Sequence, residues 1–400
     1  MLRFLRLILY PIKVALRPVW RLNYELTIAL LYPVNVVLAV MLRHYVRPRS
    51  VLHINYMNHI PYNYVRILRL HGVNAAFLAV GRSPYWDKCD YQFQPQGLPF
   101  LAALTEFWTF WTIVARYEVV HAHFMITHTR TQWELPFLKR MHRTLVVNWR
   151  GCEIRDRDLN MQLHPLMNIC EQCDYNASIC QSPVNQARRR MAKKYGDITL
   201  VSTPDMRDFV PDGIHFPFFA PPDLPEPCGP SSPRWPAKPV FKIIHATVHP
   251  GIEGSAQIEA TIRRLQERGW PLQYEFLHMV EHHKIINALR DADLAIGKMK
   301  MGYYANFQIE AMAMGVPTIT YVRDEFMTDE LRNSGFIFAT LPTLETTIEH
   351  YLQHPEKLAE KRVKARQSIL ALHDNDRLAK HLIVIYQQVA PPIPATGGQR

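Results

Sequence analysis

The chain has 400 residues, of which 48% are hydrophobic and 20% charged. This balance is typical of a globular protein and excludes a disordered chain, and the length suits two domains of ordinary size. The formal net charge is +11, and seven of those charges belong to residues 1–50, which hold eight Arg or Lys and one acid. Because the remainder is close to neutral, the composition argues against nucleic-acid binding by the folded body.

Residues 1–49 form a basic and apolar leader whose most apolar part, 26–42, contains Pro33 and Asn35. A cleaved signal peptide needs one uninterrupted apolar core, and a membrane span needs about 20 apolar residues. Helices packed against the body are a further alternative. A basic segment lying on an anionic leaflet fits best. We therefore expect attachment to the cytoplasmic side of a membrane, peripherally or through a single N-terminal span.

Strands and helices are predicted to alternate through residues 50–216. Strands are expected at 50–56, 75–80, 117–124, 145–149 and 198–202, and helices at 63–71 and 98–116. Such alternation is typical of a parallel α/β sheet. We predict an N-terminal Rossmann-like domain over 50–216.

Residues 217–239 contain nine prolines, which indicates a stiff extended linker. A second α/β unit follows, with strands at 240–245, 273–278, 293–297 and 318–322 and a helix at 256–268. The tail over 356–389 reads as helical and charged. We predict a second Rossmann-like domain over 240–380, and a helix and tail over 381–400 that cross back to the first domain.

Two histidines end the strand predicted at 117–124. Strand ends that face a cleft carry reacting groups in α/β proteins, although His121-x-His123 also fits a strand cap bonded to the backbone. Alternate residues of a strand share a face, so the pair could begin a metal site. No acid or third histidine that would complete such a site is evident from the sequence pattern. From the residues alone, the structural role is favoured.

A turn after the strand at 145–149 contains Arg150, Gly151 and Glu153. It fits a ligand-facing turn and a surface turn with a solvated Arg–Glu pair about equally well.

Six cysteines occur, and four of them lie close together in the sequence, at Cys152, Cys170, Cys173 and Cys180. The spacing of Cys170 and Cys173 is that of metal ligands, and a four-thiolate zinc site is conceivable. The other two cysteines do not form a second such pair, so reduced, partly buried thiols are favoured and no metal is expected. Disulfides are disfavoured in the cytosol.

Residues 292–322 read as a buried strand, a small-residue loop, a short helix and a second buried strand. Helix N-termini at the carboxyl edge of a parallel sheet bind anions. Glu310 lies in a helix that is otherwise apolar, where a buried carboxylate needs a partner. We predict a phosphate-bearing sugar ligand here, bound by Glu310 and by the loop residues Gly302, Tyr303, Tyr304, Ala305, Asn306 and Phe307.

The segment after the strand at 240–245 supplies further candidates. The backbone at Gly251 and Gly254 can approach phosphate, next to His249. Lys298 and Lys300 precede the Gly302 loop and could provide cations.

The block NFQIEAMAMGVPTI at 306–319 resembles the nucleotide-sugar site of GT-B glycosyltransferases of glycosyltransferase family 4. In that family two glutamates eight positions apart flank the loop and helix. The second glutamate, which holds the ribose hydroxyls, matches Glu310, whereas the first position is Gly302 here. The family also ends the 245–254 segment in Lys-Gly to neutralise the donor diphosphate, where this chain has Glu253 and Gly254.

The resemblance extends to the first predicted domain. Family members carry an acidic-Val-Val-His-x-His strand whose second histidine contacts the donor sugar, and this residue matches His123. The turn at Arg150 corresponds to a turn that faces the acceptor. The resemblance implies a GT-B fold, that is, two Rossmann-like domains with a cleft between them, and a retaining transfer without a bound metal.

We therefore expect a hexosyltransferase-type enzyme of polysaccharide biosynthesis. The substrates would be a UDP- or GDP-linked sugar and a lipid-linked or polysaccharide acceptor, without a separate cofactor. His123 is the candidate catalytic residue. The alternative is a GT-B-shaped protein that no longer catalyses and serves as a membrane-recruited partner of an active transferase, because Gly302 and Glu253 replace family Glu and Lys.

Overall fold

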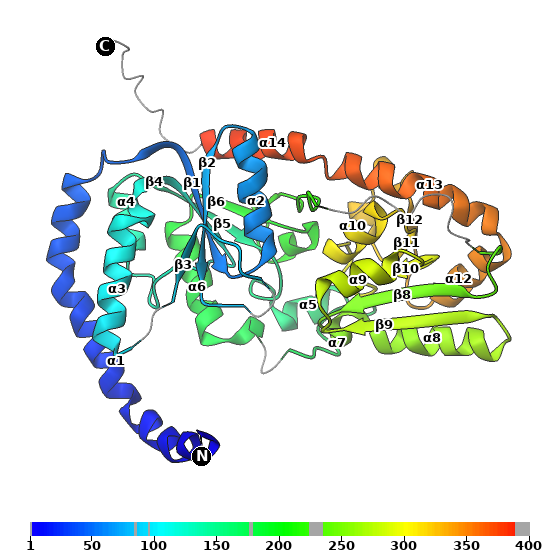
Figure 1. The fold of residues 1–400 in the computed structure, drawn as a ribbon, viewed down its shortest axis with the longest axis horizontal. Helices are drawn as coiled ribbons and strands as arrows, with labels where there is room; N and C mark the ends of the chain where they lie inside the picture. The colour runs from blue at the N-terminus through cyan, green and yellow to red at the C-terminus, as the bar shows by residue number, and fades with distance from the viewer. Residues whose placement is uncertain (1, 84–85, 95–96, 176–178, 224–234, 389–400) are drawn as a thin grey trace, which may run out of the picture. The chain divides into compact units, whose positions relative to one another are not determined.

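The computed structural model describes residues 2–83, 86–94, 97–175, 179–223 and 235–388, with the backbone alone for 2–17. Two parallel sheets, each accompanied by helices, make up the fold (Figure 1). The predicted α/β class with two Rossmann-like sheets is confirmed.

The first sheet has seven strands in the order β3-β2-β1-β4-β5-β6-β7. Its inner strands are buried almost throughout; β1, for example, has six consecutive buried residues. Such continuous burial is expected of parallel strands covered on both faces. The strands are β1 (Arg47–Tyr56), β2 (Asn74–Val80), β3 (Tyr91–Phe93), β4 (Tyr117–His123), β5 (Thr144–Trp149), β6 (Ile198–Val201) and β7 (Ile214–His215).

Helices connect these strands as the alternating pattern predicts. The Asn58 side chain accepts the N–H of Ile60 and caps the first of them, α2. The short strands β3 and β7 were not predicted, because three and two residues carry too little periodicity. The helices of this part are α2 (His59–Leu70), α3 (Pro99–Thr112), α4 (Leu135–Arg140), α5 (Arg157–Leu163) and α6 (Pro183–Tyr195).

The second sheet has five strands in the order β12-β11-β10-β8-β9. Its inner strand β8 is buried at all seven residues, and apolar side chains of β8, β10 and β11 form one core with α8 and α12. The strands are β8 (Phe241–Thr247), β9 (Leu272–His278), β10 (Leu294–Ile296), β11 (Thr318–Thr320) and β12 (Phe336–Phe338). The helices are α7 (Pro250–Glu253), α8 (Ser255–Glu267), α9 (His282–Leu289), α10 (Asn306–Ala313), α11 (Asp329–Arg332), α12 (Leu344–Gln353), α13 (Pro355–Leu372) and α14 (Asn375–Gln387).

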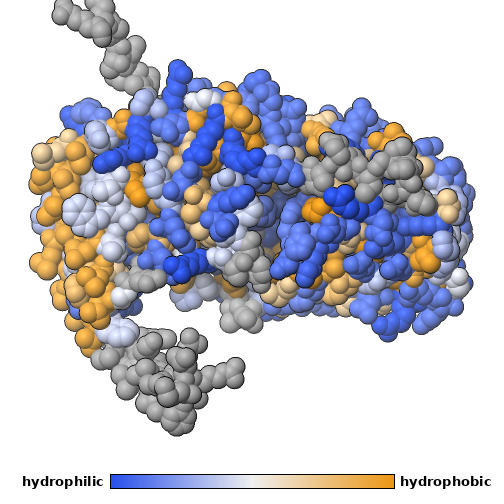
Figure 2. Space-filling view, viewed as in Figure 1, coloured by the Kyte–Doolittle hydropathy of each residue, from blue (hydrophilic) through white to orange (hydrophobic). Residues whose placement is uncertain are grey.

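The leader forms one long helix, α1 (Leu2–Met41). One face packs on α3: the Tyr24 hydroxyl donates a hydrogen bond to Glu106, and Trp111 Nε1 donates to Asn35 Oδ1 at 2.7 Å. Other side chains of α1 form an exposed apolar surface, seen along the left of Figure 2. Within α1, Pro18–Met41 is long and apolar enough to cross a membrane, with a mean hydropathy of 1.7.

By their contacts the residues divide into two compact units. The first unit is Met1–Asn148, Arg188–Thr199 and Ala379–Arg400, and the second is Trp149–Ala187 and Leu200–Leu378. The predicted linker at 217–239 and the predicted C-terminal tail lie partly outside the described residues, so their boundaries stay predictions.

Candidate functional site

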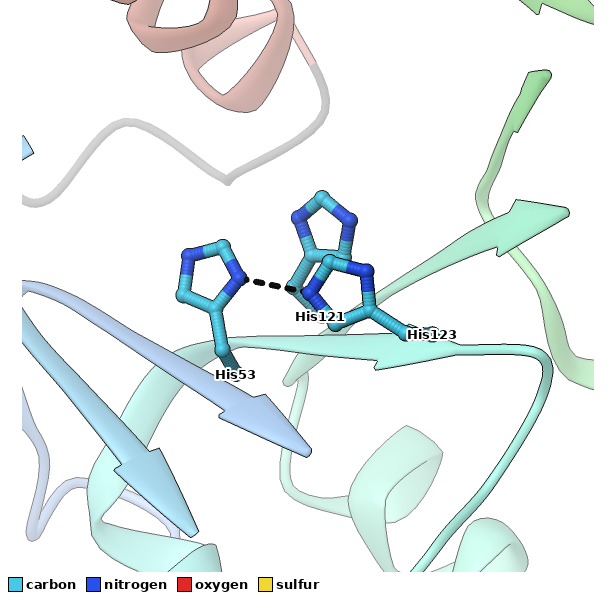
Figure 3. Close-up of side chains that lie close together, drawn as sticks. All are labelled: His53, His121 and His123. Atoms are coloured by element: carbon cyan, nitrogen blue, oxygen red, sulfur yellow. Dashed lines mark hydrogen bonds between the residues drawn. The ribbon is translucent and has the colours of Figure 1, made fainter. Parts of the chain in front are cut away.

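Three histidines meet near the carboxyl ends of β1 and β4 in the first unit (Figure 3). His53 and His121 are register partners on these parallel neighbours, and His123 follows His121 on the same strand face. The His53 Nδ1 and His123 Nε2 atoms are 3.0 Å apart and share a hydrogen bond. All three side chains are fully buried. The sequence therefore located two of the three rings, and the sheet register supplies the third.

Further aromatic groups orient these rings. His121 Nδ1 lies 2.7 Å from the Tyr386 hydroxyl of α14, which belongs to the same unit. The Tyr64 ring presents an edge to His121 and to His123, at centroid distances of 6.0 and 5.5 Å. A chain of hydrogen-bonded imidazoles can hold and pass a proton. Since the ligand nitrogens of the three rings all lie within 4.8 Å of one another, the set could also bind a metal ion.

Glu310 lies inside α10 of the second unit and is buried. Its Oε1 atom is 3.1 Å from Nε2 of His282, in α9. The hydrogen bond to Glu310 raises the pKa of His282. Glu310 therefore has the partner that a buried carboxylate needs. That partner is His282, whose side chain is about half exposed to solvent.

The loop before α10 is held in place by side chains that follow it. Ala305 precedes the helix in an extended conformation, and the Gln308 side chain accepts the Ala305 N–H at 3.2 Å. Asn306 and Phe307 form the first turn of α10. The Tyr304 hydroxyl, buried beside the stacked ring of Tyr303, lies 3.0 Å from His373 Nε2.

Gly302 has a physical reason to be glycine. Its φ is +82°, a left-handed conformation that favours glycine, and a Cβ there would lie 2.7 Å from Cγ of Arg323. The Arg323 guanidinium in turn donates to Asp208 Oδ2 at 2.9 Å. A glutamate at position 302 would therefore need a different backbone and a displaced arginine.

The two candidate lysines are already engaged. The Lys298 ammonium pairs with the Glu253 carboxylate. Lys300 is buried, its Nζ atom donates to Gln172 Oε1 at 2.8 Å, and burial lowers its pKa. Glu253 therefore offsets the charge of Lys298 next to the candidate diphosphate loop.

The glycine loop after β8 also has a local partner. Gly254 adopts a left-handed conformation between α7 and α8, and the Gly251 N–H donates to Asp174 Oδ2 at 3.2 Å. His249 lies against the ring of Tyr175, with centroids 3.8 Å apart. The Asp174 carboxylate thus accepts a hydrogen bond from one of the backbone N–H groups that we expected to bind phosphate.

The turn after β5 is folded around its own glutamate. Glu153 Oε1 accepts the N–H groups of Arg150 and Gly151 at 2.6 and 3.0 Å. Burial raises the pKa of Glu153. The Arg150 guanidinium lies over the ring of Phe218, 5.3 Å from its centroid. Both side chains are thus buried, contrary to the alternative of a surface turn with a solvated Arg–Glu pair. The four clustered cysteines, Cys152, Cys170, Cys173 and Cys180, line one cavity of the second unit.

Comparison with known proteins locates the fold. No model of a protein family matches the chain, and no curated protein matches it in sequence. Among solved structures it is similar to a sucrose-phosphate synthase from Thermosynechococcus elongatus, with a TM-score of 0.58 and 12% identity over 85% of this chain and 99% of that one.

Two further similar structures carry bound nucleotides. HepE from Anabaena, in complex with UDP and glucose, has a TM-score of 0.54 and 10% identity over 85% of this chain and 100% of that one. The catalytic domain of starch synthase IV from Arabidopsis thaliana, bound to ADP and acarbose, has a TM-score of 0.54 and 10% identity over 85% of this chain and 99% of that one. The chain has a GT-B-like α/β fold.

Several functional candidates were not predicted from the sequence. His53, Tyr386 and Arg323 join the sites through sheet register, a C-terminal helix and a loop. Asp174 and Gln172 come from the cysteine-rich loop. Only His53 left a signal that could have been used, a histidine at the same depth of the neighbouring predicted strand.

Proposed function

We propose that this protein is a glycosyltransferase that moves a sugar from a UDP- or GDP-linked donor to a lipid-linked or polysaccharide acceptor, with retention. The observation that carries the proposal is the buried Glu310 carboxylate in α10, next to the carboxyl edge of a parallel sheet in a GT-B-like fold. In such folds that edge is where ligands bind. The nucleotide-bound relatives of similar fold support this choice of donor class.

The residues divide the work between them. Glu310 accepts hydrogen bonds from the ribose hydroxyls, in exchange for its present bond to His282. The N–H groups at the start of α10 and the Lys298 ammonium face the leaving diphosphate. His123 lies against the donor sugar and accepts or donates a hydrogen bond where charge develops. Glycosyl transfer of this kind depends on positioning and electrostatic stabilisation rather than on a cofactor.

A panel of nucleoside diphosphates tests this function through thermal stability. A ligand that binds only the folded state at 100 times its Kd stabilises it by about 2.7 kcal/mol. We expect UDP or GDP to raise the Tm of the wild-type protein and not that of Glu310→Gln. The matched control Glu267→Gln, at the exposed end of α8, keeps the shift. A flat response of the wild type to every nucleotide contradicts the proposal.

The second candidate is a catalytically inactive partner protein. The Lys298–Glu253 pair and the Asp174 carboxylate at Gly251 favour it, because both reduce the positive potential that a diphosphate needs. This candidate predicts no turnover with any nucleotide sugar in the presence of membrane lipid extract. Release of nucleoside diphosphate that depends on the extract would decide for the enzyme.

The exposed apolar face of α1 supports attachment to a membrane. Leu22, Leu26 and Leu30 follow a helical spacing of four and are 57%, 54% and 78% exposed. We expect the triple change of these leucines to Glu to move the protein from vesicles of anionic lipid to solution, while Val363→Glu on the exposed side of α13 leaves binding unchanged. Release of the wild type by high salt indicates peripheral attachment, and retention indicates a span.

A further inference from the structure

Four of the six cysteines converge on one cavity in the second unit. Cys152 lies in the turn after β5, Cys170 and Cys173 in the loop after α5, and Cys180 in the short helix Ile179–Gln181. The cavity measures about 120 Å³, and each of the four cysteines is a thiol rather than half of a disulfide. Segments up to 28 positions apart thus direct their sulfurs to one space, which the sequence spacing did not establish.

The loop that carries the central pair is preorganised. The Asn168 side chain, only 2% exposed, accepts the N–H groups of Cys170 and Glu171 at 2.9 and 2.8 Å. This turn fixes the backbone immediately before Cys-x2-Cys, the spacing that zinc and iron–sulfur sites share.

Charged and apolar groups complete the wall of the cavity, and they include the acid Glu171 as well as two arginines. Arg155, which is 3% exposed, is held by Asp205 at 2.5 Å and directs its Nη1 atom to Cys152 Sγ at 3.8 Å. Arg157 also lines the cavity, as do the apolar side chains of Ile169 and Ile252. Four thiolates around a metal carry a net negative charge, which the buried Arg155 guanidinium offsets in part. Hydrogen bonds to the sulfurs and exclusion of water are what tune such centres.

The separation of the sulfurs distinguishes two kinds of centre. Around one tetrahedral zinc ion, with Zn–S near 2.3 Å, sulfurs lie about 3.8 Å apart. Among the described residues, the three-histidine group is the only set of three or more His, Cys, Asp or Glu ligand atoms within 4.8 Å of one another. No three of the four cysteine sulfurs therefore lie within 4.8 Å of one another, as three sulfurs around a single zinc ion would. In a cubane cluster each cysteine binds a different iron, so the sulfurs stand further apart than around a single ion.

We propose that Cys152, Cys170, Cys173 and Cys180 ligate an iron–sulfur cluster of the [4Fe–4S] type. On binding, each thiol gives up its proton and each sulfur binds one iron of the cluster, whose irons and sulfides come from the cellular supply. The site is independent of the sugar-transfer chemistry.

The cluster has a structural consequence for the donor loop, and this step rests on the proposed function. Asp174, one residue after Cys173, accepts the Gly251 N–H, and the Gln172 carbonyl oxygen lies 2.0 Å from where a Gly251 Cβ would stand. The cysteine loop is therefore packed on the candidate phosphate loop. An intact cluster holds Gln172 and Asp174 in place, and its loss frees them.

Metal and sulfide analysis of the full-length protein, purified without oxygen, tests the proposal. We expect about four irons and four acid-labile sulfides per chain, and a broad visible absorption that dithionite bleaches. The double variant Cys170→Ser, Cys173→Ser loses both, whereas Cys89→Ser, in the first unit, keeps them.

Three results overturn the assignment. One zinc per chain without sulfide would identify a single-ion site. Wild-type protein that contains neither iron nor zinc would show that the cysteines bind no metal. Iron and sulfide that persist in the double variant would place the cluster elsewhere. Because the wild-type content decides the main point, a variant that fails to fold does not obscure it. Iron and sulfide content is measured independently of nucleotide binding. The test of the cluster therefore stands even if the proposed function fails.

Discussion

The carboxyl ends of the two sheets carry different chemistry. Near the end of β4 the candidate groups are imidazoles and a phenol, stacked and hydrogen-bonded to one another. Around β8 and β10 they are ionisable groups held in pairs, Lys298 with Glu253 and Glu310 with His282. The first arrangement suits proton sharing close to a sugar, and the second suits an anionic ligand that can exchange for one member of a pair. The proposed function therefore assigns binding and chemistry to different groups of side chains.

Replacing His123 tests this division most severely. We expect His123→Asn to lower kcat about 10²- to 10⁴-fold, the usual range for loss of a positioned acid or base. The Tm shift caused by nucleoside diphosphate should stay, since that ligand belongs to the other region. The control is His142→Asn, an exposed turn residue whose φ of 56° asparagine tolerates. A parallel loss of nucleotide binding would break the comparison.

The first unit contains a buried acid, Glu106, whose pKa is raised. Burial raises its pKa to about 7, although Tyr24, Trp133 and Arg130 all donate hydrogen bonds to it. The unfolded chain releases this proton near 4.5, so between these pH values the folded state binds more protons and stability falls as pH rises. Above pH 7 the loss levels off at about 3 kcal/mol or less.

Glu106→Gln should therefore remove this pH dependence. We expect the Tm of the wild type to fall between pH 5 and pH 7 relative to the variant, with the gap constant above that range. Thermal unfolding of both proteins at several pH values measures this difference in Tm. Equal profiles for both proteins would show that the carboxyl is ionised throughout.

Gly302 tests the rigidity of the charged region. Gly302→Ala introduces a left-handed alanine and a contact with Arg323, and we expect a loss of about 1–3 kcal/mol in the free energy of unfolding. Gly269 has a similar φ of +92°, but a Cβ added there would meet nothing within 4 Å, so Gly269→Ala reports the backbone cost alone. The difference between the variants measures the Arg323 contact, and equal losses would refute it.

The smallest expected effect concerns the Lys298–Glu253 pair. Glu253→Gln removes the negative charge next to the candidate diphosphate loop and leaves Lys298 available. We expect the Kd for nucleoside diphosphate to fall about tenfold, equivalent to about 1.4 kcal/mol. Isothermal titration at low salt measures the change, and Glu259→Gln on the exposed face of α8 is the control. Weaker binding in Glu253→Gln would mean that the glutamate positions the lysine.

The strongly periodic elements could be predicted from the sequence, and the charge partners could not. The strands β1, β4, β8 and β10 are rich in Val, Ile, Leu and Ala and are buried over most of their length, as is typical of parallel strands covered on both faces. The partners of Glu310 and Lys298 come from other segments of the chain. Ion pairs between distant polar residues produce no periodic pattern in the sequence. Glu153 illustrates the point, since a pair that fitted a surface turn is in fact a buried cap.

The sequence by itself determined the α/β class, the basic apolar leader and the positions of Glu310, His123 and the four cysteines, because hydrophobic periodicity and local residue patterns act over short distances. The tertiary structure alone decided that His53 joins His121 and His123, that Arg323 lies over Gly302 and that the four cysteines share one cavity. Those contacts depend on strand register and on loops that meet across many residues, and their energies are set only when the chain is packed.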